Sequence, residues 1–435
     1  MITTTYYNSL KSHKKIFAIL FCLLFFIYTA FTYPYFTGTI GIGGKIQPEP
    51  EKFPQVLMDS YFAGQFDLSK NLFLRTSFSM YTTESIFKDI TFKNTESIFS
   101  LDEISLTYLG SFGQISHLLG IHLGEYEPVG SDVFLQRQFG IPSFASRLTE
   151  SICGISRAKI YDMSGIGGSY VVKLPKNIAV GTSIYYNKTE NFETPEEDDI
   201  SESFNTDFRF ASAGRIGAID LTFGLTMPMK REIVHDNGDT QKVILLIERA
   251  DMHAGLTAFL GSSNSSSLLF QAGFTKLIID PSEENDEKVL SLNDVYILVE
   301  PRFVSKSMCI SLSLFNMPKE TRENLFYVEN PVGISLSLYT PWISLSGKKS
   351  QFGLMTTVSS SDSLDKIIIQ QEAEQSNEEK MSNLGLHISP YGIIYLGGGK
   401  LNFSLNVNAF NIKDFDTFLD NISLIAGYKV ALWWK

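Results

Sequence analysis

The sequence predicts an all-β fold: a transmembrane antiparallel meander β-barrel of about 18 strands (roughly 14 to 18), preceded by a signal peptide. Three observations support this prediction: long segments of alternating apolar and polar residues, connections that alternate in length, and an N-terminal segment typical of exported proteins. Because side chains of a strand point to opposite faces with a period of two, such alternation indicates a strand with one apolar face.

The N-terminal segment has the layout of an export signal. Three lysines precede the apolar run 16–29, and an imperfect small-residue cleavage motif follows at residues 30–32. We expect residues 1–32 to be removed as a signal peptide, which leaves residues 33–435 as the barrel. The alternative is an uncleaved anchor helix, but the apolar run is shorter than the roughly 18 residues such a helix requires.

Composition and charge limit the possible functions. Of the 435 residues 44% are hydrophobic, yet only 19% are charged, below the roughly 25% usual for soluble domains. Cleavage would remove three of the 36 basic residues and none of the 47 acidic ones, which changes the net charge from −11 to −14. That charge argues against a nucleic-acid partner. Cys153 and Cys309 would remain, and their pairing is possible but not required.

Eighteen alternating segments follow the signal. The last, residues 421–434, is longer than the five or six residues of an ordinary strand and fits the roughly nine to eleven that cross a bilayer. The expected strands begin near residues 34, 55, 70, 99, 113, 164, 176, 204, 215, 252, 266, 292, 306, 331, 350, 380, 399 and 421.

The connections between these segments alternate between short and long. The long links are 47–54, 83–98, 125–163, 188–203, 229–251, 280–291, 317–330, 360–379 and 412–420. Outer-membrane barrels have short turns at one end and longer loops at the other, whereas a sandwich has no reason for this regularity. Links 188–203 and 280–291 are strongly acidic; this indicates either solvated loops or sites for divalent cations.

The terminal alternation Tyr428, Val430, Leu432 and Trp434 carries a family resemblance. The chain resembles a porin-type outer-membrane β-barrel protein of diderm bacteria, spirochaetes among them. In that family the last strand usually ends on an aromatic residue that the barrel assembly machinery recognises. Here Lys435 follows Trp434, which departs from the pattern. The resemblance implies residence in outer-membrane lipid of the cell and passage of small hydrophilic solutes.

In a barrel, the polar members of each alternation face the lumen, because an Arg or Lys facing lipid near the midplane costs roughly 2–4 kcal/mol. The expected pore-lining residues are Asp59, Arg75, Glu103, His122, Lys173, Asp207, Arg209, Asp220, Glu300, Arg302, His387 and Lys429. The alternative is a hydrated wall whose charges form internal ion pairs.

The link 125–163 is unusually long and mixes bulky apolar with charged side chains. The resemblance implies a loop that folds into the barrel and narrows the channel; the alternative is a cap packed over the mouth. The charged residues expected at the constriction are Glu125, Asp132, Arg137, Arg147 and Arg157.

Signals for catalysis or cofactors are absent from the sequence, so we expect no enzyme, no cofactor and no metal site. His117 and His122 lie five apart on one strand and therefore face opposite sides. The expected function is passive diffusion of small hydrophilic solutes. The alternatives are a surface-exposed structural or adhesive barrel with a blocked lumen, and a large soluble periplasmic β-protein. No feature of the sequence assigns an oligomeric state.

Overall fold

A computed structural model describes residues 35–48, 54–86, 97–150, 159–190, 200–234, 240–247, 250–262, 265–278, 294–322, 325–362, 383–410 and 421–434. Within these residues no helix is both long and apolar enough to cross a bilayer. The strands are β1 (Tyr35–Gln47), β2 (Gln55–Ser69), β3 (Leu72–Thr82), β4 (Ser97–Phe112), β5 (Ile115–Val129), β6 (Tyr161–Leu174), β7 (Ile178–Glu190), β8 (Ile200–Gly214), β9 (Gly217–Val234), β10 (Thr240–Ile247), β11 (Asp251–Gly261), β12 (Ser267–Ile278), β13 (Val295–Val304), β14 (Cys309–Asn316), β15 (Val332–Tyr339), β16 (Ile343–Leu345), β17 (Lys348–Ser360), β18 (Leu384–Leu396), β19 (Gly399–Asn408) and β20 (Ile422–Trp434). The helical elements are α2 (Val133–Phe139), the 3-10 turn η2 (Arg147–Thr149) and α3 (Lys319–Arg322).

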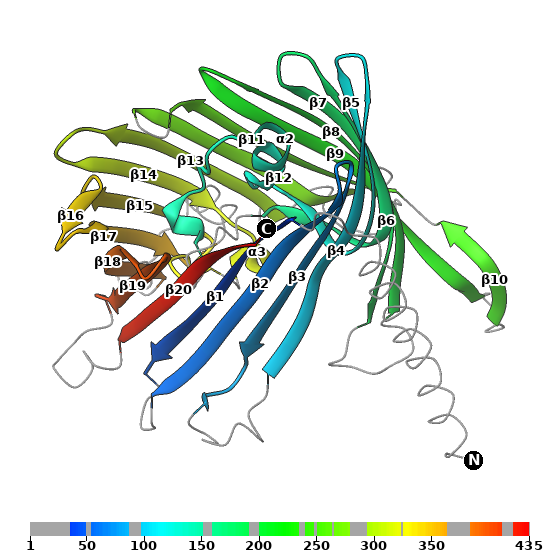
Figure 1. Cartoon of the computed structure of the whole chain (residues 1–435). Helices are drawn as coiled ribbons and strands as arrows, with labels where there is room; N and C mark the ends of the chain where they lie inside the picture. Colours follow the sequence, from blue (N-terminus) through cyan, green and yellow to red (C-terminus); the bar gives the residue numbers. More distant parts are fainter. Residues whose placement is uncertain are drawn as a thin grey trace.

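These strands form one closed antiparallel barrel (Figure 1). The ring closes where β1 pairs with β20, in a register that places Phe36 opposite Trp434. Strand β10 pairs only with β9, and β16 only with β17, among the described residues. Removing these two from the 20 strands of the sheet leaves an 18-strand ring, which confirms the predicted fold class.

The expected strand positions agree closely with the structure. Each of the eighteen expected starts lies within four residues of an observed strand start. One detail of the expectation was wrong. The link 229–251 contains the extension of β9 and strand β10 rather than only a loop. At Pro341 the chain leaves the sheet between β15 and β16.

The two faces of the wall differ as a membrane barrel requires. On β5 the outward side chains Leu119 and Ile121 are 58% and 61% exposed, whereas His122 on the inner parity is 4% exposed. The outer face of the described strands is almost wholly apolar, and the inner face is rich in Ser, Thr and charged residues. Tyr108 and Trp342 are exposed beside short turns, as an interfacial aromatic girdle predicts. The side chain of Trp434 lies outside the described residues.

The short turns lie at the end of the barrel where β1 begins and β20 ends. One of them, between β18 and β19, consists of Gly397 and Gly398 with φ of 58° and 82°. Positive φ at both central residues is the conformation of a type I′ hairpin turn, which glycine adopts without strain. We call this the turn end and the opposite end the loop end.

Candidate functional site

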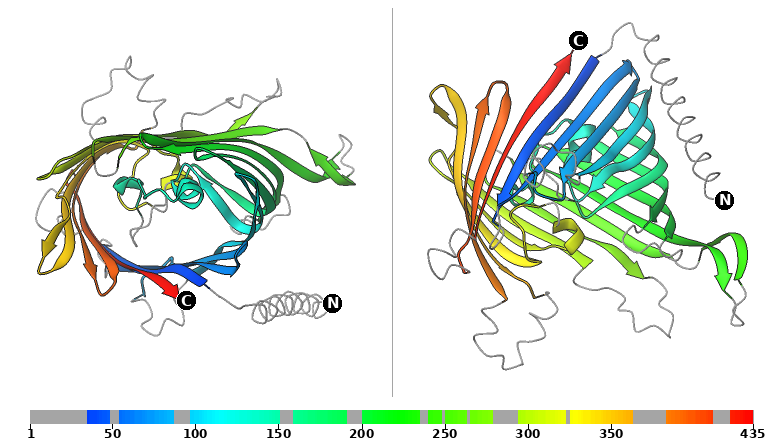
Figure 2. Two further views of the ribbon diagram at one scale, coloured as in Figure 1. Left: turned by 45° about the horizontal axis from the view of Figure 1, so that its top comes forward. Right: turned by 90° about the horizontal axis from the view of Figure 1, so that it is seen from below.

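Two connections fold into the barrel instead of away from it (Figure 2). The first inward loop (residues 130–150) follows β5 and carries α2 and η2. The second inward loop (described residues 317–322 and 325–331) lies between β14 and β15 and carries α3. The side chains of Phe134, Leu135 and Leu148 on the first loop are at most 2% exposed. These three apolar side chains of link 125–163 are therefore buried in the lumen, as a loop folding inward predicts.

Local contacts set the path of the first inward loop. Before α2, the Ser131 hydroxyl donates to the carbonyl of Pro128 at 2.9 Å and accepts the backbone N–H of Val133 at 3.3 Å. After α2, Gly140 adopts a left-handed conformation with φ of 65°, and its N–H donates to the carbonyl of Gln136. A left-handed glycine at this position is a common helix terminator. The helix is thus limited to two turns and the chain reverses inside the barrel.

Asp132 holds the reversal together. Its Oδ2 accepts the backbone N–H groups of Phe144 at 2.9 Å and Ala145 at 3.2 Å, and the hydroxyl of Ser143 at 2.7 Å. Asp132 is 3% exposed and has therefore lost its hydrogen bonds to water. The three protein donors compensate for that loss. This expected constriction residue therefore shapes the loop rather than facing solvent.

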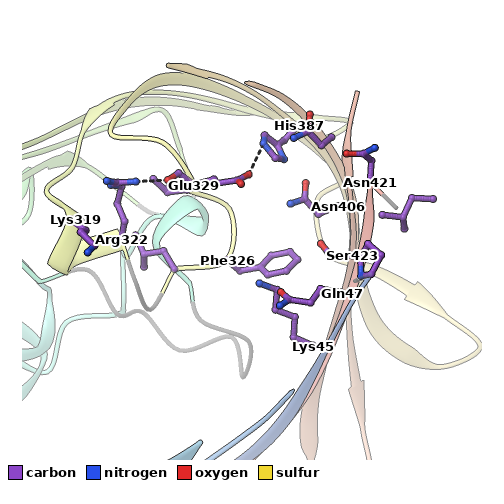
Figure 3. A pocket seen from close by; sticks show the side chains of 15 residues that line it. Lys45, Gln47, Lys319, Arg322, Phe326, Glu329, His387, Asn406, Asn421 and Ser423 are labelled. Atoms are coloured by element: carbon purple, nitrogen blue, oxygen red, sulfur yellow. Dashed lines mark hydrogen bonds and ion pairs between the residues drawn. The ribbon is translucent and has the colours of Figure 1, made fainter. Parts of the chain in front are cut away.

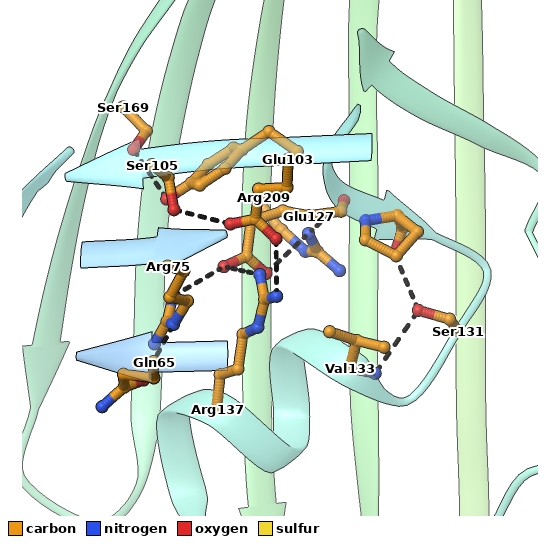
Figure 4. Close-up of polar contacts among 12 residues, drawn as sticks. Gln65, Arg75, Glu103, Ser105, Glu127, Ser131, Val133, Arg137, Ser169 and Arg209 are labelled. Atoms are coloured by element: carbon orange, nitrogen blue, oxygen red, sulfur yellow. Dashed lines mark hydrogen bonds and ion pairs between the residues drawn. The ribbon is translucent and has the colours of Figure 1, made fainter. Parts of the chain in front are cut away.

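A buried charge cluster joins the start of the first inward loop to the wall (Figure 4). Arg137 Nη2 lies 2.8 Å from Glu103 on β4, and its Nη1 lies 3.1 Å from Glu127 on β5. Arg75 on β3 approaches Glu127 from the other side at 3.9 Å. Burial alone would lower the pKa of Arg137, but the charges of Glu103 and Glu127 outweigh it and raise that pKa.

A second arginine, Arg209, connects α2 to strands β8 and β9. Arg209 on β8 places its guanidinium 3.9 Å from the centroid of the Phe134 ring. The same guanidinium donates from Nε to Asp220 at 2.8 Å and from Nη1 to the carbonyl of Glu127 at 3.1 Å. Because a paired guanidinium is planar, it stacks on an aromatic ring while it holds a carboxylate. Arg209 thereby links β8, β9 and the inward loop.

The far end of the first inward loop crosses to β11 and β13. Phe144 stacks on Phe259 of β11 with ring centroids 4.6 Å apart. The hydroxyl of Ser146 donates to Glu300 on β13, which also accepts Arg302 Nε at 2.7 Å. The loop therefore spans the lumen from β5 to β13.

Arg147 joins the two inward loops. Its guanidinium lies 3.9 Å from the centroid of the Tyr391 ring on β18 and donates to Glu150 at 2.7 Å and to the Tyr327 hydroxyl at 3.3 Å. Glu150 also lies 3.9 Å from Lys400 on β19. Burial would raise the pKa of Glu150, but the charges of Arg147, Lys400 and Lys429 hold it below its usual value.

The second inward loop is held by backbone and ionic contacts. Arg322 donates from Nε to the carbonyl of Met317 at 3.0 Å and from Nη1 to the carbonyl of Glu329. The carboxylate of Glu329 lies 3.0 Å from His387 Nε2 on β18. The hydrogen bond to His387 and the charges of His387 and Lys45 lower the pKa of Glu329, although burial acts the other way.

A cavity of about 640 Å³ lies between the second inward loop and the wall at the loop end (Figure 3). It is bounded by the last residues of β1, the first residues of β20 and the inner faces of β18 and β19. Lys45 of β1 extends into it, with Nζ 5.9 Å from the centroid of the Phe326 ring.

The inward loops do not cover the whole wall. On β11 the inner-face residues His253, Thr257 and Phe259 are 3%, 1% and 6% exposed. On β2 every residue except Gly64 and the terminal Ser69 is half-buried, whichever face it occupies, and inner-face residues of β3 such as Arg75 are also half-buried. The lumen is therefore packed against β8 to β13 and more accessible along β2 and at neighbouring positions such as Thr39 on β1 and Lys429 on β20.

The twelve wall residues expected to line a pore all lie on the inner parity of their strands. Seven are buried: Glu103, His122, Asp207, Arg209, Asp220, Glu300 and His387. Five are half-buried: Asp59, Arg75, Lys173, Arg302 and Lys429. Of these five, Lys173 donates to the carbonyl of Gln138 on the inward loop and Arg302 pairs with Glu300. Asp59 and Lys429 lie on β2 and β20 at the more accessible part of the wall. Arg75 on β3 lies between that part and the charge cluster, where it donates to Gln65 at 3.0 Å and approaches Glu127.

The expected constriction residues lie in different parts of the chain. Glu125 lies in β5, before the loop begins, and pairs with Lys159 at 3.2 Å. Arg137 and Arg147 lie in the lumen, as described above, whereas Arg157 and Cys153 fall outside the described residues. Cys309 is buried on the inner parity of β14.

Sequence reasoning missed several residues of this site. Glu127, which adjoins three arginines, was not distinguished from its neighbours. The second inward loop was treated as an ordinary long link, although its run Leu325-Phe326-Tyr327-Val328 is as apolar as the loop that was expected to fold inward. That run was the available signal. Among the described residues no group of three or more His, Cys, Asp or Glu side chains could hold a metal ion.

No protein-family model and no curated protein sequence matches the chain. The chain is similar to solved porin structures. OccAB3 of Acinetobacter baumannii is 9% identical with a TM-score of 0.48, and the match covers 93% of this chain and 100% of that one. OmpF of Salmonella typhi, solved in complex with daunomycin, is 9% identical with a TM-score of 0.41, covering 92% and 97%. OprB of Pseudomonas putida is 8% identical with a TM-score of 0.40, covering 92% and 94%. The fold assignment rests on the closed ring of strands.

Proposed function

We propose that this protein is a porin-like channel of the outer membrane through which small hydrophilic solutes diffuse passively. The observation that carries the proposal is the half-buried inner face of β2, together with neighbouring half-buried positions such as Thr39 on β1, Arg75 on β3 and Lys429 on β20, beside a lumen otherwise packed by two loops. Barrels of about 16 to 18 strands enclose enough space for an aqueous channel. The solute would follow the uncovered wall.

The buried and half-buried wall residues have different roles in this proposal. Buried groups such as Glu103, Asp220 and Glu300 hold the inward loops by ion pairs and hydrogen bonds. Half-exposed groups such as Asp59 and Lys429 face the solute. Both signs of charge occur on that wall, so selectivity depends on local arrangement rather than on total charge.

The orientation follows from the two ends of the barrel. We infer that the turn end, with both chain termini, faces the periplasm and that the loop end faces outward. The acidic links with Glu197 and Glu284, which lie outside the described residues, would then be external. Outer-membrane lipid contacts the apolar belt, and the assembly machinery recognises β20.

Thiol labelling combined with bilayer conductance tests the proposal. In a background without native cysteines (Cys22→Ser, Cys153→Ser, Cys309→Ser), Thr39→Cys places a thiol on the half-buried inner face of β1. Thr257→Cys places one on the packed inner wall of β11, where the native side chain is 1% exposed, and Ile40→Cys places one on the outer face. A charged methanethiosulfonate should lower the conductance of the Thr39→Cys variant alone.

A correctly folded barrel that never conducts would contradict the channel. It would support the alternative, a surface-exposed structural or adhesive barrel whose lumen is blocked by the inward loops. Equal block through Thr39→Cys and Thr257→Cys would retain the channel but show that the solute path is not confined to the wall around β2.

A further inference from the structure

The cavity between the second inward loop and the wall has the chemistry of a recognition site. Its volume of about 640 Å³ is in the range of pockets that enclose small ligands. It lies at the loop end, because Lys45 and Gln47 are at the end of β1 and Ser423 is at the beginning of β20. A solute entering from that end would meet it before the first inward loop.

Cations outnumber anions around this cavity. Lys45, Lys319 and Arg322 line it, and Glu329 is the one acidic side chain among the described lining residues. The carboxylate of Glu329 is already engaged by His387 at 3.0 Å (Figure 3). Three cationic side chains face one carboxylate among the described lining residues, so the local charge favours a negatively charged ligand.

Lys45 is the cation best placed to receive such a ligand. Its ammonium lies over the Phe326 ring and, among the residues that the structure describes, forms no ion pair or hydrogen bond. Arg322, by contrast, is committed to the carbonyls of Met317 and Glu329 and fixes the loop. Glu329 acts on the Lys45 ammonium group only through its charge, without a direct contact among the described residues. The three donors of the ammonium group can therefore bind an incoming anionic oxygen.

The rest of the lining is suited to hydroxyl groups. Asn406, Asn408 and Asn421 line the wall side together with Gln47 and Ser423. Ser389 donates to Asn406 Oδ1 at 2.9 Å, which orients the amide so that its NH₂ can donate to a ligand. Phe326 adds one aromatic face, against which the C–H groups of a small polyol could pack.

We propose that this cavity is a binding site for a small hydroxylated organic anion, with Lys45 as the residue that binds the anionic group. The inference deepens the channel function by naming the class of solute that the entrance recognises. Amide side chains bind the hydroxyl groups, and the second inward loop forms the inner wall of the site.

Calorimetric titration of the folded barrel in detergent tests this site separately from conductance. Gluconate is the probe, and sorbitol is its neutral counterpart with the same hydroxylated chain. Gluconate should bind and sorbitol should bind far more weakly. Lys45→Gln should weaken gluconate binding about tenfold, since a charge-assisted hydrogen bond is lost. Lys45→Arg should retain most of it.

The control is Lys70→Gln, which makes the same change of charge at an exposed turn of the other end. It should leave gluconate binding unchanged. Equal binding of sorbitol and gluconate, or equal effects of Lys45→Gln and Lys70→Gln, would overturn the anion site. If the barrel conducts but binds no gluconate, the anion site is rejected and the channel function is retained. If the barrel binds gluconate but does not conduct, the channel function is rejected and the anion site is retained.

Discussion

The guanidinium of Arg209 packs on the ring of Phe134, 3.9 Å from the ring centroid, while it donates hydrogen bonds to Asp220 and to the carbonyl of Glu127. One wall residue thus contacts the helix of the first inward loop and the backbone that leads into it. The contact therefore holds the first inward loop against β8 and β9.

Phe134→Ala should therefore loosen the first inward loop. The ring is 2% exposed, and truncating a buried Phe removes about 3 kcal/mol of packing or more. We expect higher and noisier single-channel conductance, with the barrel still folded by its heat-modifiable gel mobility. The control is Phe208→Ala, on the same strand as Arg209, because the ring of Phe208 is 49% exposed on the outer face of the barrel. A matching conductance change in the control would contradict the role of the Arg209 contact.

Glu127→Gln should shift ion selectivity toward anions. The side chain is buried among Arg75, Arg137 and Arg209, and its replacement removes the negative charge that these cations share. The reversal potential in a potassium chloride gradient measures the shift. Glu125→Gln removes the same charge two residues earlier, where the side chain is 46% exposed, and should change the potential much less because water screens it.

Acid should release the second inward loop. The pKa of Glu329 is lowered by its hydrogen bond to His387, so the contact stabilises the attached loop fully above the ordinary carboxyl pKa of roughly 4.3. That stabilisation is lost as the pH falls through the lower pKa of the folded state. Conductance noise should thus increase only below about pH 4. Glu329→Gln should show the noise at neutral pH already, and an unchanged acid response in this variant would exclude Glu329 as the titrating group.

Ile121→Arg should destabilise the barrel. This side chain is 61% exposed on the outer face of β5, where a charge facing hydrocarbon costs roughly 2–4 kcal/mol. Unfolding by guanidinium chloride in lipid vesicles would show the loss. Thr39→Arg, on the half-buried inner face of β1, should cost much less because water can solvate the charge. The opposite order of stabilities would reverse the assignment of the two faces.

The barrel was predictable because its pattern is local. The alternation in β5, β9 and β20 sets the two faces residue by residue, and short turns such as Gly397-Gly398 mark where strands reverse. The inner parity of residues such as Glu103 and Arg209 follows from the same pattern. Strand β10 was not predicted because its segment lies in a long connection, and among the described residues it pairs only with the extended β9.

The contacts of the site were not predictable from the sequence, because they join residues far apart in the chain. Ser146 meets Glu300, and Arg147 meets both Tyr327 and Tyr391, only after the ring has formed and the loops have entered it. Periodicity assigns a side chain to a face but not to a partner. The half-buried wall around β2 is likewise a consequence of where the loops do not reach.

The seam between β1 and β20 has a consequence for the order of assembly. Phe36 and Trp434 pair across almost the full length of the chain, and closing so long a loop carries the largest entropic cost of any strand pairing here. The seam should consequently be the last pairing to form. Until then both edge strands present unpaired backbone groups. In lipid these groups have no hydrogen-bond partners, and in water they promote pairing with strands of other chains. During folding, closure of the seam therefore competes with pairing of the edge strands with other chains. A linker joining residues 434 and 35 should accelerate closure.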